Sequence, residues 1–274
     1  MLDTARIDYL LGDATLGTTK IVIVGLGSGG AAVLERLAMC GVGRWSLYDP
    51  DALEPVNLVK HPGRRSDLGR AKTAIAREWL ADRNPKARIE HVGGDVMADD
   101  HFVTDIADAA LVICAVDTPQ ARSHVNEVCV EQRIPCVYGS VFRTGMGGEL
   151  YAYLPGETGC HDCKTRYSLA QGRDIENWLS LTDEERQRIY GMGEKDFLAS
   201  GLAADIAVVA SYHAHYVVSL LAGAKSEYLT VPSFNWFTVS LRRIEGLFAA
   251  MYETSRVLLR PQNDCHRNCA GGSS

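Results

Sequence analysis

The sequence predicts an α/β protein in which a parallel sheet continues into an antiparallel half. Residues 21–24 and 110–116 are apolar runs typical of buried strands, and a helical segment follows each. From residue 148 onward, short alternating segments are typical of antiparallel strands. With 274 residues, of which 46% are hydrophobic, one large core is feasible. We therefore expect a single domain over 1–274, with an N-terminal arm (1–20), a first half (21–154) and a second half (155–274).

A glycine motif, Gly25-x-Gly27-x-Gly29-Gly30, follows the first apolar run and precedes a helix, a strand at 45–48 and Asp49. This order is that of a Rossmann-like nucleotide-binding unit. Gly25 permits the tight turn, Gly27 lets backbone approach a phosphate, and Gly30 allows close packing of the helix on the strand. Asp49 falls nineteen residues after Gly30, where an acid would bind a ribose hydroxyl. The alternative is a purely structural turn.

The stretch after Asp49 is more cationic and polar than a diphosphate requires. Its residues are Asp51, Asn57, Lys60, His61, Arg64, Arg65 and Lys72. A triphosphate carries more charge, and attack on its α-phosphate needs cations that neutralise the leaving pyrophosphate. The stretch therefore favours a nucleoside triphosphate, although a solvated basic loop would have the same composition.

Asp117 ends the second apolar run, and the helix after it carries Arg122 and Asn126. Ligands of open α/β sheets gather at the carboxyl ends of the strands, so Asp117 is a candidate Mg²⁺ ligand beside a triphosphate. The alternative is that Asp117 only caps the helix that begins at Thr118-Pro119.

Together these residues resemble the ThiF/MoeB/ubiquitin-activating-enzyme superfamily, over about residues 21–221. The resemblance is carried by the glycine motif, Asp49-x-Asp51, Asn57-x-x-Lys60, Gly69-x-x-Lys72, Cys114-Ala115-Val116-Asp117 with Arg122 and Asn126, and residues 134–140. Members of the superfamily use ATP to adenylate the C-terminal carboxylate of a small protein or peptide. The resemblance implies the same reaction here, on a ubiquitin-like or sulfur-carrier protein or on a peptide; a modified tRNA carboxylate would need a similar site.

The resemblance also implies roles for individual residues. Asp49 would bind the ribose hydroxyls, Asn57 and Lys60 would lie near the triphosphate, Lys72 would contact the phosphates, and Asp117 would hold Mg²⁺. Lys60 stands where the family usually has arginine. Because lysine lacks the bidentate fork of arginine, Lys60 would orient the phosphates less strictly, or Arg64 or Arg65 would share that role.

An N-terminal arginine from the neighbouring subunit reaches the triphosphate in family members. Arg6 is the only candidate for that role here, which implies a homodimer. The alternative is that Arg6 merely covers a helix surface.

Two cysteine pairs, Cys160-His161-Asp162-Cys163 and Cys265-His266-Arg267-Asn268-Cys269, lie far apart in the sequence. Each can place two thiolates on one turn, and together they predict a four-cysteine zinc clip that ties the C-terminal tail to the middle of the chain. The second spacing is one residue longer than the commonest knuckle. A disulfide pairing or inert thiols are the alternatives, but the chain shows no secretory signal, which favours a reducing cytoplasm and metal.

The other cysteines, Cys40, Cys114, Cys129 and Cys136, lie in apolar contexts typical of core residues. The stretch 173–204, where thioester-forming relatives carry their nucleophile, contains Ser200 but no thiol. If the resemblance holds, the enzyme stops at the acyl-adenylate or passes it to an external acceptor. A thioester on Cys160 or Cys163 would require that zinc is absent.

The second half of the chain contains further predicted elements. A strand at 148–154 alternates as a sheet edge would, and a charged helix opening at Thr182 would be a surface segment or a lid. A long apolar helix spans 203–221, with His213 and His215 as core or interface residues. Strands at 228–231, 234–237, 241–247 and 255–259 would form a platform for an extended peptide tail or a homodimer seam.

The composition and motifs of the chain argue against several classes of function. The formal net charge is −6, with no basic tail for nucleic acid and no apolar run of membrane length. A NAD-dependent oxidoreductase is disfavoured because no catalytic His or Tyr-x-x-x-Lys accompanies the glycine motif. A non-catalytic partner subunit of an activating heterodimer would have lost the phosphate-binding cations, whereas Lys72 and Asp117 are both present.

Overall fold

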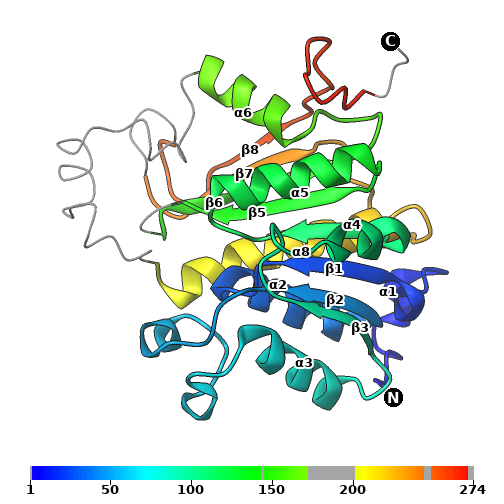
Figure 1. The fold of residues 1–274 in the computed structure, drawn as a ribbon. Coiled ribbons are helices and arrows are strands. Elements are labelled where there is room, and N and C mark those ends of the chain that lie inside the picture. Colours follow the sequence, from blue (N-terminus) through cyan, green and yellow to red (C-terminus); the bar gives the residue numbers. More distant parts are fainter. Residues whose placement is uncertain (1, 143–144, 172–200, 244–247, 271–274) are drawn as a thin grey trace.

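A computed structural model describes residues 2–142, 145–171, 201–243 and 248–270. Its centre is an eight-stranded sheet in the order β3-β2-β1-β4-β5-β6-β7-β8 (Figure 1). The sheet is parallel from β3 to β5 and antiparallel from β5 to β8. The predicted α/β fold, with a Rossmann-like sheet that continues into an antiparallel half, is confirmed.

The parallel half consists of β1 (Lys20–Val24), β2 (Arg44–Tyr48), β3 (Arg88–Gly93), β4 (Leu111–Cys114) and β5 (Cys136–Val141). Strand β1 lies between β2 and β4, so the chain leaves β1 on one side and returns on the other. Such a switch point opens a crevice at the carboxyl ends of the strands, and the glycine motif follows β1 at that end. The topology therefore places the candidate site at the predicted edge of the sheet.

Helices cover both faces of the sheet (Figure 1). On one face, α2 (Ser28–Met39), α3 (Lys72–Arg83) and α8 (Ala203–Ala222) pack over a core that includes Ile21, Ile23 and Val217. On the other, α4 (His101–Asp105), α5 (Pro119–Glu131) and α6 (His161–Ala170) cover Val22 and Val24. Because β1 is buried on both faces, it is apolar at every position except Lys20.

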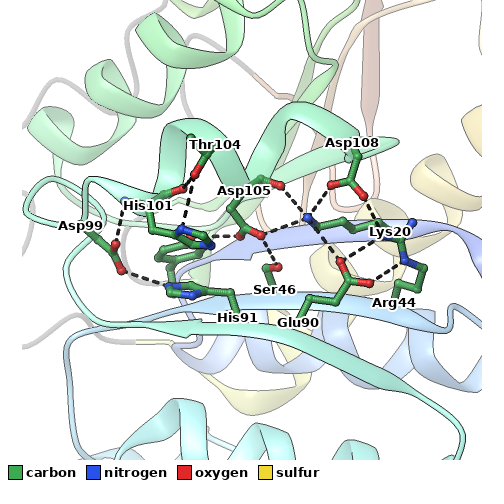
Figure 2. Close-up of polar contacts among 11 residues, drawn as sticks. Lys20, Arg44, Ser46, Glu90, His91, Asp99, His101, Thr104, Asp105 and Asp108 are labelled. Carbon is green, nitrogen blue, oxygen red and sulfur yellow. Dashed lines mark hydrogen bonds and ion pairs between the residues drawn. The ribbon is translucent and has the colours of Figure 1, made fainter.

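Lys20 and its partners form a partly buried polar network between the sheet and α4. Its Nζ lies 3.0 Å from Asp105 Oδ1 and 2.6 Å from Asp108 Oδ1, and Figure 2 shows Arg44 and Glu90 closing the network at the strands. Burial lowers the pKa of Lys20, but hydrogen bonds to Asp108 and Asp105 outweigh that effect and raise it. The network satisfies its charges internally and docks α4 with the 3₁₀ turn η4 (Ile106–Asp108), which is a structural role.

The antiparallel half consists of β6 (Gly147–Tyr153), β7 (Trp236–Ser240) and β8 (Thr254–Val257). The prediction that 148–154 is a sheet edge is wrong, because β6 pairs with both β5 and β7 and is buried along its whole length. Its alternation separates two covered faces: Leu150 packs in the core under α8, whereas Tyr151 and Tyr153 pack in the core on the α6 side.

The platform predicted after residue 223 is smaller than expected. Residues 228–231 form no strand, because Ser226 Oγ accepts the N–H groups of Tyr228 and Leu229 and holds the chain in a turn. The strand predicted at 234–237 begins at Trp236, and the one predicted at 255–259 spans Thr254–Val257. Residues 241–243 are not a strand, and 244–247 lie outside the described residues, as do the charged helix after Thr182 and Ser200.

The long helix predicted at 203–221 is confirmed as α8. It is the one helix, among the residues described, that is long and apolar enough to cross a membrane, with mean hydropathy 1.2 and half of that stretch buried. The sequence analysis expected no apolar run of membrane length, and that expectation is corrected for this one helix. The helix packs along α2 and against β5 and β6, so its apolar composition is accounted for by the core. His213 is buried there, and His215 is exposed.

Candidate functional site

Two of the four motif glycines lie against other backbone atoms, and two face open space. Gly25 has φ +92°, and a Cβ there would lie 2.8 Å from the Ala115 carbonyl, while a Cβ on Gly30 would lie 1.9 Å from the Gly25 oxygen. These two positions need glycine for the tight turn and for close packing. Gly27 and Gly29 have nothing within 4 Å of such a Cβ, so they face open space. Helix α2 begins there without a side-chain cap, which leaves its N-terminus suited to an anion.

Asp49 holds the glycine turn to the end of β2. Its Oδ2 accepts the Leu26 N–H at 2.6 Å, and its Oδ1 accepts the Asp51 N–H at 2.9 Å. Burial raises the pKa of this carboxyl, and the two backbone hydrogen bonds oppose that rise. Each carboxylate oxygen can accept a second hydrogen bond, so the remaining capacity suits a ribose hydroxyl.

Lys72 begins α3 and points back toward the same acids. Its Nζ lies 2.7 Å from Asp51 Oδ2 and 3.8 Å from Asp49 Oδ1. The backbone supports this placement, since the Lys72 N–H donates to the Asp51 carbonyl at 3.0 Å. The side chain is almost buried, whereas Asp51 is exposed. The structure thus joins three of the predicted residues, Asp49, Asp51 and Lys72.

Lys60 and Asp117 are two further charged residues predicted for the site. Lys60 is half-buried at the end of the 3₁₀ helix η2 (Pro55–Val59), and burial lowers its pKa. The charge of Asp117 raises that pKa and the charge of Lys72 lowers it further, so the three charges act on one region. Asp117 is exposed after β4. The alternative that Asp117 caps α5 is wrong, because Thr118 is the N-cap and its Oγ1 accepts the Ala121 N–H.

Asn57 has a local bonding role. Its Oδ1 accepts the Glu54 N–H at 2.9 Å, which completes a capping box around η2. The amide is half-buried and stabilises the segment that presents Lys60. Arg64 and Arg65 are exposed in the next turn.

His61 is a site residue whose role the sequence did not indicate. It is buried; its Nε2 lies 3.0 Å from the Leu26 carbonyl, and its Nδ1 accepts the Gly63 N–H at 2.9 Å. This pattern requires a neutral ring with hydrogen on Nε2, and burial lowers the pKa of His61 accordingly. His61 is therefore neutral, unlike the lysines and arginines near it in the sequence. Its hydrogen bond to Leu26 connects the glycine turn to the segment that carries Lys60.

A cleft of about 270 Å³ opens beside these residues. It lies between α2, the η2 segment and the start of α8. Its lining includes Ser28, Glu35, Lys60, His61 and Ile206. Because Ser28 begins α2 and Lys60 ends η2, the cleft adjoins the glycine turn.

Among the residues predicted for the nucleotide site, Arg6 is the one that lies at the opposite end of the parallel strands. It is exposed and precedes α1 (Asp8–Leu11), which leads through the 3₁₀ turn η1 (Leu16–Thr18) to the amino end of β1 (Figure 1). The glycine turn follows the carboxyl end of the same strand. Within one chain, therefore, the structure does not bring Arg6 to Lys60, Lys72 or Asp117.

The four predicted metal ligands converge. The Sγ atoms of Cys160, Cys163, Cys265 and Cys269 all lie within 4.8 Å of one another. Sγ–Sγ distances are 4.0 Å for Cys160–Cys163, 3.7 Å for Cys160–Cys265 and 3.6 Å for Cys163–Cys269. A tetrahedral zinc with Zn–S bonds of about 2.3 Å separates its sulfurs by about 3.8 Å, so the cluster fits zinc. The arrangement clips the C-terminal tail to the start of α6.

Three of the remaining cysteines are core residues, as predicted, whereas Cys40 lies only at the margin of the core. Cys114, Cys129 and Cys136 are buried, and Cys40 is half-buried in the loop after α2. Burial raises the pKa of Cys40, Cys114 and Cys136, which makes their thiolates scarce.

A switch-point crevice with a glycine turn, a buried acid and two lysines places the protein in the class of Rossmann-like α/β proteins. The chain belongs to the ThiF family, whose model matches residues 6–251. This result confirms the family that the sequence motifs indicated.

Curated relatives share about half of the chain. Ubiquitin-like modifier-activating enzyme 5 of Dictyostelium discoideum is 28% identical over 166 residues, which cover 57% of this chain and 44% of the relative. The Arabidopsis thaliana enzyme of the same name is 30% identical over 170 residues, covering 57% of this chain and 39% of the relative. The match thus spans less than half the length of these relatives.

Solved structures share the fold over almost the whole chain. Escherichia coli MccB with ATP has a TM-score of 0.65 at 22% identity and covers 96% of this chain and 68% of MccB. The structure of PaaA has a TM-score of 0.65 at 19% identity and covers 89% of this chain and 74% of PaaA.

Proposed function

We propose that this protein catalyses ATP-dependent adenylation of the C-terminal carboxylate of a small protein or peptide, with release of pyrophosphate. The observation that carries the proposal is the position of Lys72, which lies 2.7 Å from Asp51 and 3.8 Å from Asp49. Nearby, the start of α2 is open and uncapped, and its first residue, Ser28, lines one cleft with Lys60. That region combines cations, an acid and backbone N–H groups, which a triphosphate requires and a hydride transfer does not.

Each residue of the site has a separate proposed role. Asp49 binds the ribose, and the α2 N-terminus at Gly27 and Gly29 faces the phosphates. Lys72 leaves its contact with Asp51 to hold the phosphates together with Lys60. Asp117, exposed at the end of β4, would hold Mg²⁺, which neutralises phosphate charge when bound.

In the reaction, a carboxylate oxygen of the partner attacks the α-phosphorus. A bond forms between that oxygen and phosphorus while the bond from phosphorus to the bridging oxygen of pyrophosphate breaks. Lys60 and Lys72 neutralise the charge that develops on the leaving group. The products are the acyl-adenylate and pyrophosphate.

The comparisons support this proposal. The curated relatives are named as activating enzymes of ubiquitin-like modifiers, and MccB has been solved with ATP and with MccA. We accordingly propose a ubiquitin-like or sulfur-carrier protein, or a peptide, as the partner. We further propose a cytoplasmic homodimer with Arg6 acting across subunits, structural zinc on the four cysteines, and no cysteine thioester step.

ATP–pyrophosphate exchange tests the function. Purified full-length protein is incubated with ATP, Mg²⁺ and labelled pyrophosphate, with and without each candidate partner carrying a free C-terminal carboxylate. We expect label in ATP only with a cognate partner, and none when the partner's terminus is amidated. Binding of NAD without any exchange would instead support an oxidoreductase.

A further inference from the structure

Arg267 connects the C-terminal cysteine pair to two helices at once. It lies between Cys265 and Cys269 in the sequence, and its side chain is largely buried. Its Nε lies 2.5 Å from Asp162 Oδ2 on α6. On α5, its Nη2 donates to Ser123 Oγ at 3.1 Å and its Nη1 lies 3.4 Å from Glu127 Oε1. A planar guanidinium suits such a three-partner contact, because its donors point in fixed directions.

The helix that Arg267 contacts also places Asp117. Arg122, next to Ser123, donates from Nε to the Val116 carbonyl at 2.9 Å, and Thr118 caps the start of α5. Asp117 thus lies between two residues that are bonded to α5. A displacement of the first half of α5 would therefore move Asp117 relative to the glycine turn, which the chain just before Asp117 adjoins: a Cβ on Gly25 would lie 2.8 Å from the Ala115 carbonyl.

The other cysteine pair is linked to the same part of α5. Asn126 Oδ1 accepts the His161 N–H at 2.9 Å, and His161 follows Cys160 directly. Both halves of the cysteine cluster are thus bonded to α5, one through the backbone of His161 and one through the side chain of Arg267.

We propose that Arg267 is a positioning residue: it sets the place of α5, and thereby the place of the Asp117 carboxylate beside the glycine turn. The inference rests on the proposed function for its kinetic consequence, but its structural part stands on the contacts of Arg267 alone. Through this residue, docking of the C-terminal tail is coupled to the candidate nucleotide site.

Arg166 offers a matched control. It also ties the C-terminal tail to α6, through Asp264, whose carbonyl accepts its Nη1 at 3.1 Å. Among the residues that the structure describes, Arg166 makes no hydrogen bond or ion pair with α5. Arg267→Ala and Arg166→Ala therefore both loosen the tail, but only the first removes the contact with α5.

The test compares these variants with the parental full-length protein by three measurements: bound zinc per chain, hydrogen exchange of the first two turns of α5, and the Mg²⁺ dependence of ATP–pyrophosphate exchange. For Arg267→Ala we expect zinc to be retained, the α5 amides to exchange faster, and the half-saturating Mg²⁺ concentration to rise by about tenfold or more, as expected when a reacting group is misplaced. For Arg166→Ala we expect parental values in all three. The double variant S123A/E127Q, which leaves the tail sequence intact, should reproduce the Arg267→Ala result.

Two outcomes would overturn the proposal: parental α5 exchange and parental Mg²⁺ dependence in Arg267→Ala, or equal loosening of α5 in both arginine variants. If Arg267→Ala fails to fold, S123A/E127Q decides between the same outcomes. If the parental protein shows no pyrophosphate exchange with any partner, the proposed function fails, and hydrogen exchange alone still decides whether Arg267 positions α5.

Discussion

Lys72 Nζ lies 2.7 Å from Asp51 Oδ2 and reaches it from the first residue of α3. This ion pair joins the segment just after β2 to the start of α3. A triphosphate at the α2 N-terminus would therefore compete with Asp51 for Lys72, and the exposure of Asp51 makes that exchange of partners inexpensive.

The first prediction concerns the charged residues of the site. Lys72→Ala and Asp117→Ala should each reduce pyrophosphate exchange by about a hundredfold to a thousandfold, because each removes an electrostatic contact of the transition state. Lys86→Ala, an exposed lysine just beyond the other end of α3, should exchange at the parental rate. Circular dichroism should show that all three variants are folded. Parental exchange in either site variant would exclude that residue from the site.

A second prediction concerns metal. Zinc holds together segments that are distant in sequence, so its binding free energy is part of the folding free energy. A strong chelator should release about one zinc per chain and lower the melting temperature. Cys265→Ser should do the same, whereas Cys40→Ser should keep its zinc. A zinc-free preparation of equal stability would contradict the four-cysteine zinc site.

The third prediction is that no enzyme-bound thioester forms. Changing Cys40, Cys114, Cys129 and Cys136 individually to Ala or Ser should leave pyrophosphate exchange nearly unchanged, apart from losses traceable to stability. Incubation with ATP, Mg²⁺ and the cognate partner should give acyl-adenylate, and no reductant-sensitive adduct on a denaturing gel. An adduct that maps to one cysteine would place the protein among the thioester-forming members of its family.

A fourth prediction concerns pH and His213. Burial lowers its pKa to about 4, from an ordinary value of about 6.5. Between these values the unfolded chain binds a proton that the folded chain does not. The contribution of His213 to stability is therefore complete above about pH 6.5 and is lost as the pH falls toward 4. In urea unfolding across this range, His213→Leu should flatten the decline, and His215→Leu, at an exposed position of the same helix, should leave it unchanged.

The fifth prediction tests Arg6 across subunits. Arg6→Ala and Lys72→Ala should each be inactive alone. If Arg6 serves the neighbouring site, co-refolding equal amounts should restore about a quarter of parental exchange, because half of the dimers are mixed and each has one complete site. Gel filtration should report the dimer. No recovery in mixed dimers would show that Arg6 acts elsewhere.

The sequence by itself determined the features that depend on local conformation and on residue chemistry. Gly25 and Gly30 were identified because a turn this tight excludes Cβ atoms, and the structure shows the clashes that a Cβ would make. The cysteine pairs were identified because their spacing places two sulfurs on one turn, and the four sulfurs do meet.

Only the tertiary structure decided what covers each element. Strand β6 alternates like an edge strand, yet it is central, because β5 and β7 pair with its two edges. It is buried along its whole length, because α8 covers one face and α6 the other. His61 stands in a cationic stretch, yet it is neutral and buried, because the carbonyl of Leu26, far away in sequence, reaches its Nε2. Local patterns record period and turn geometry, whereas burial and protonation depend on neighbours that only the folded chain brings together.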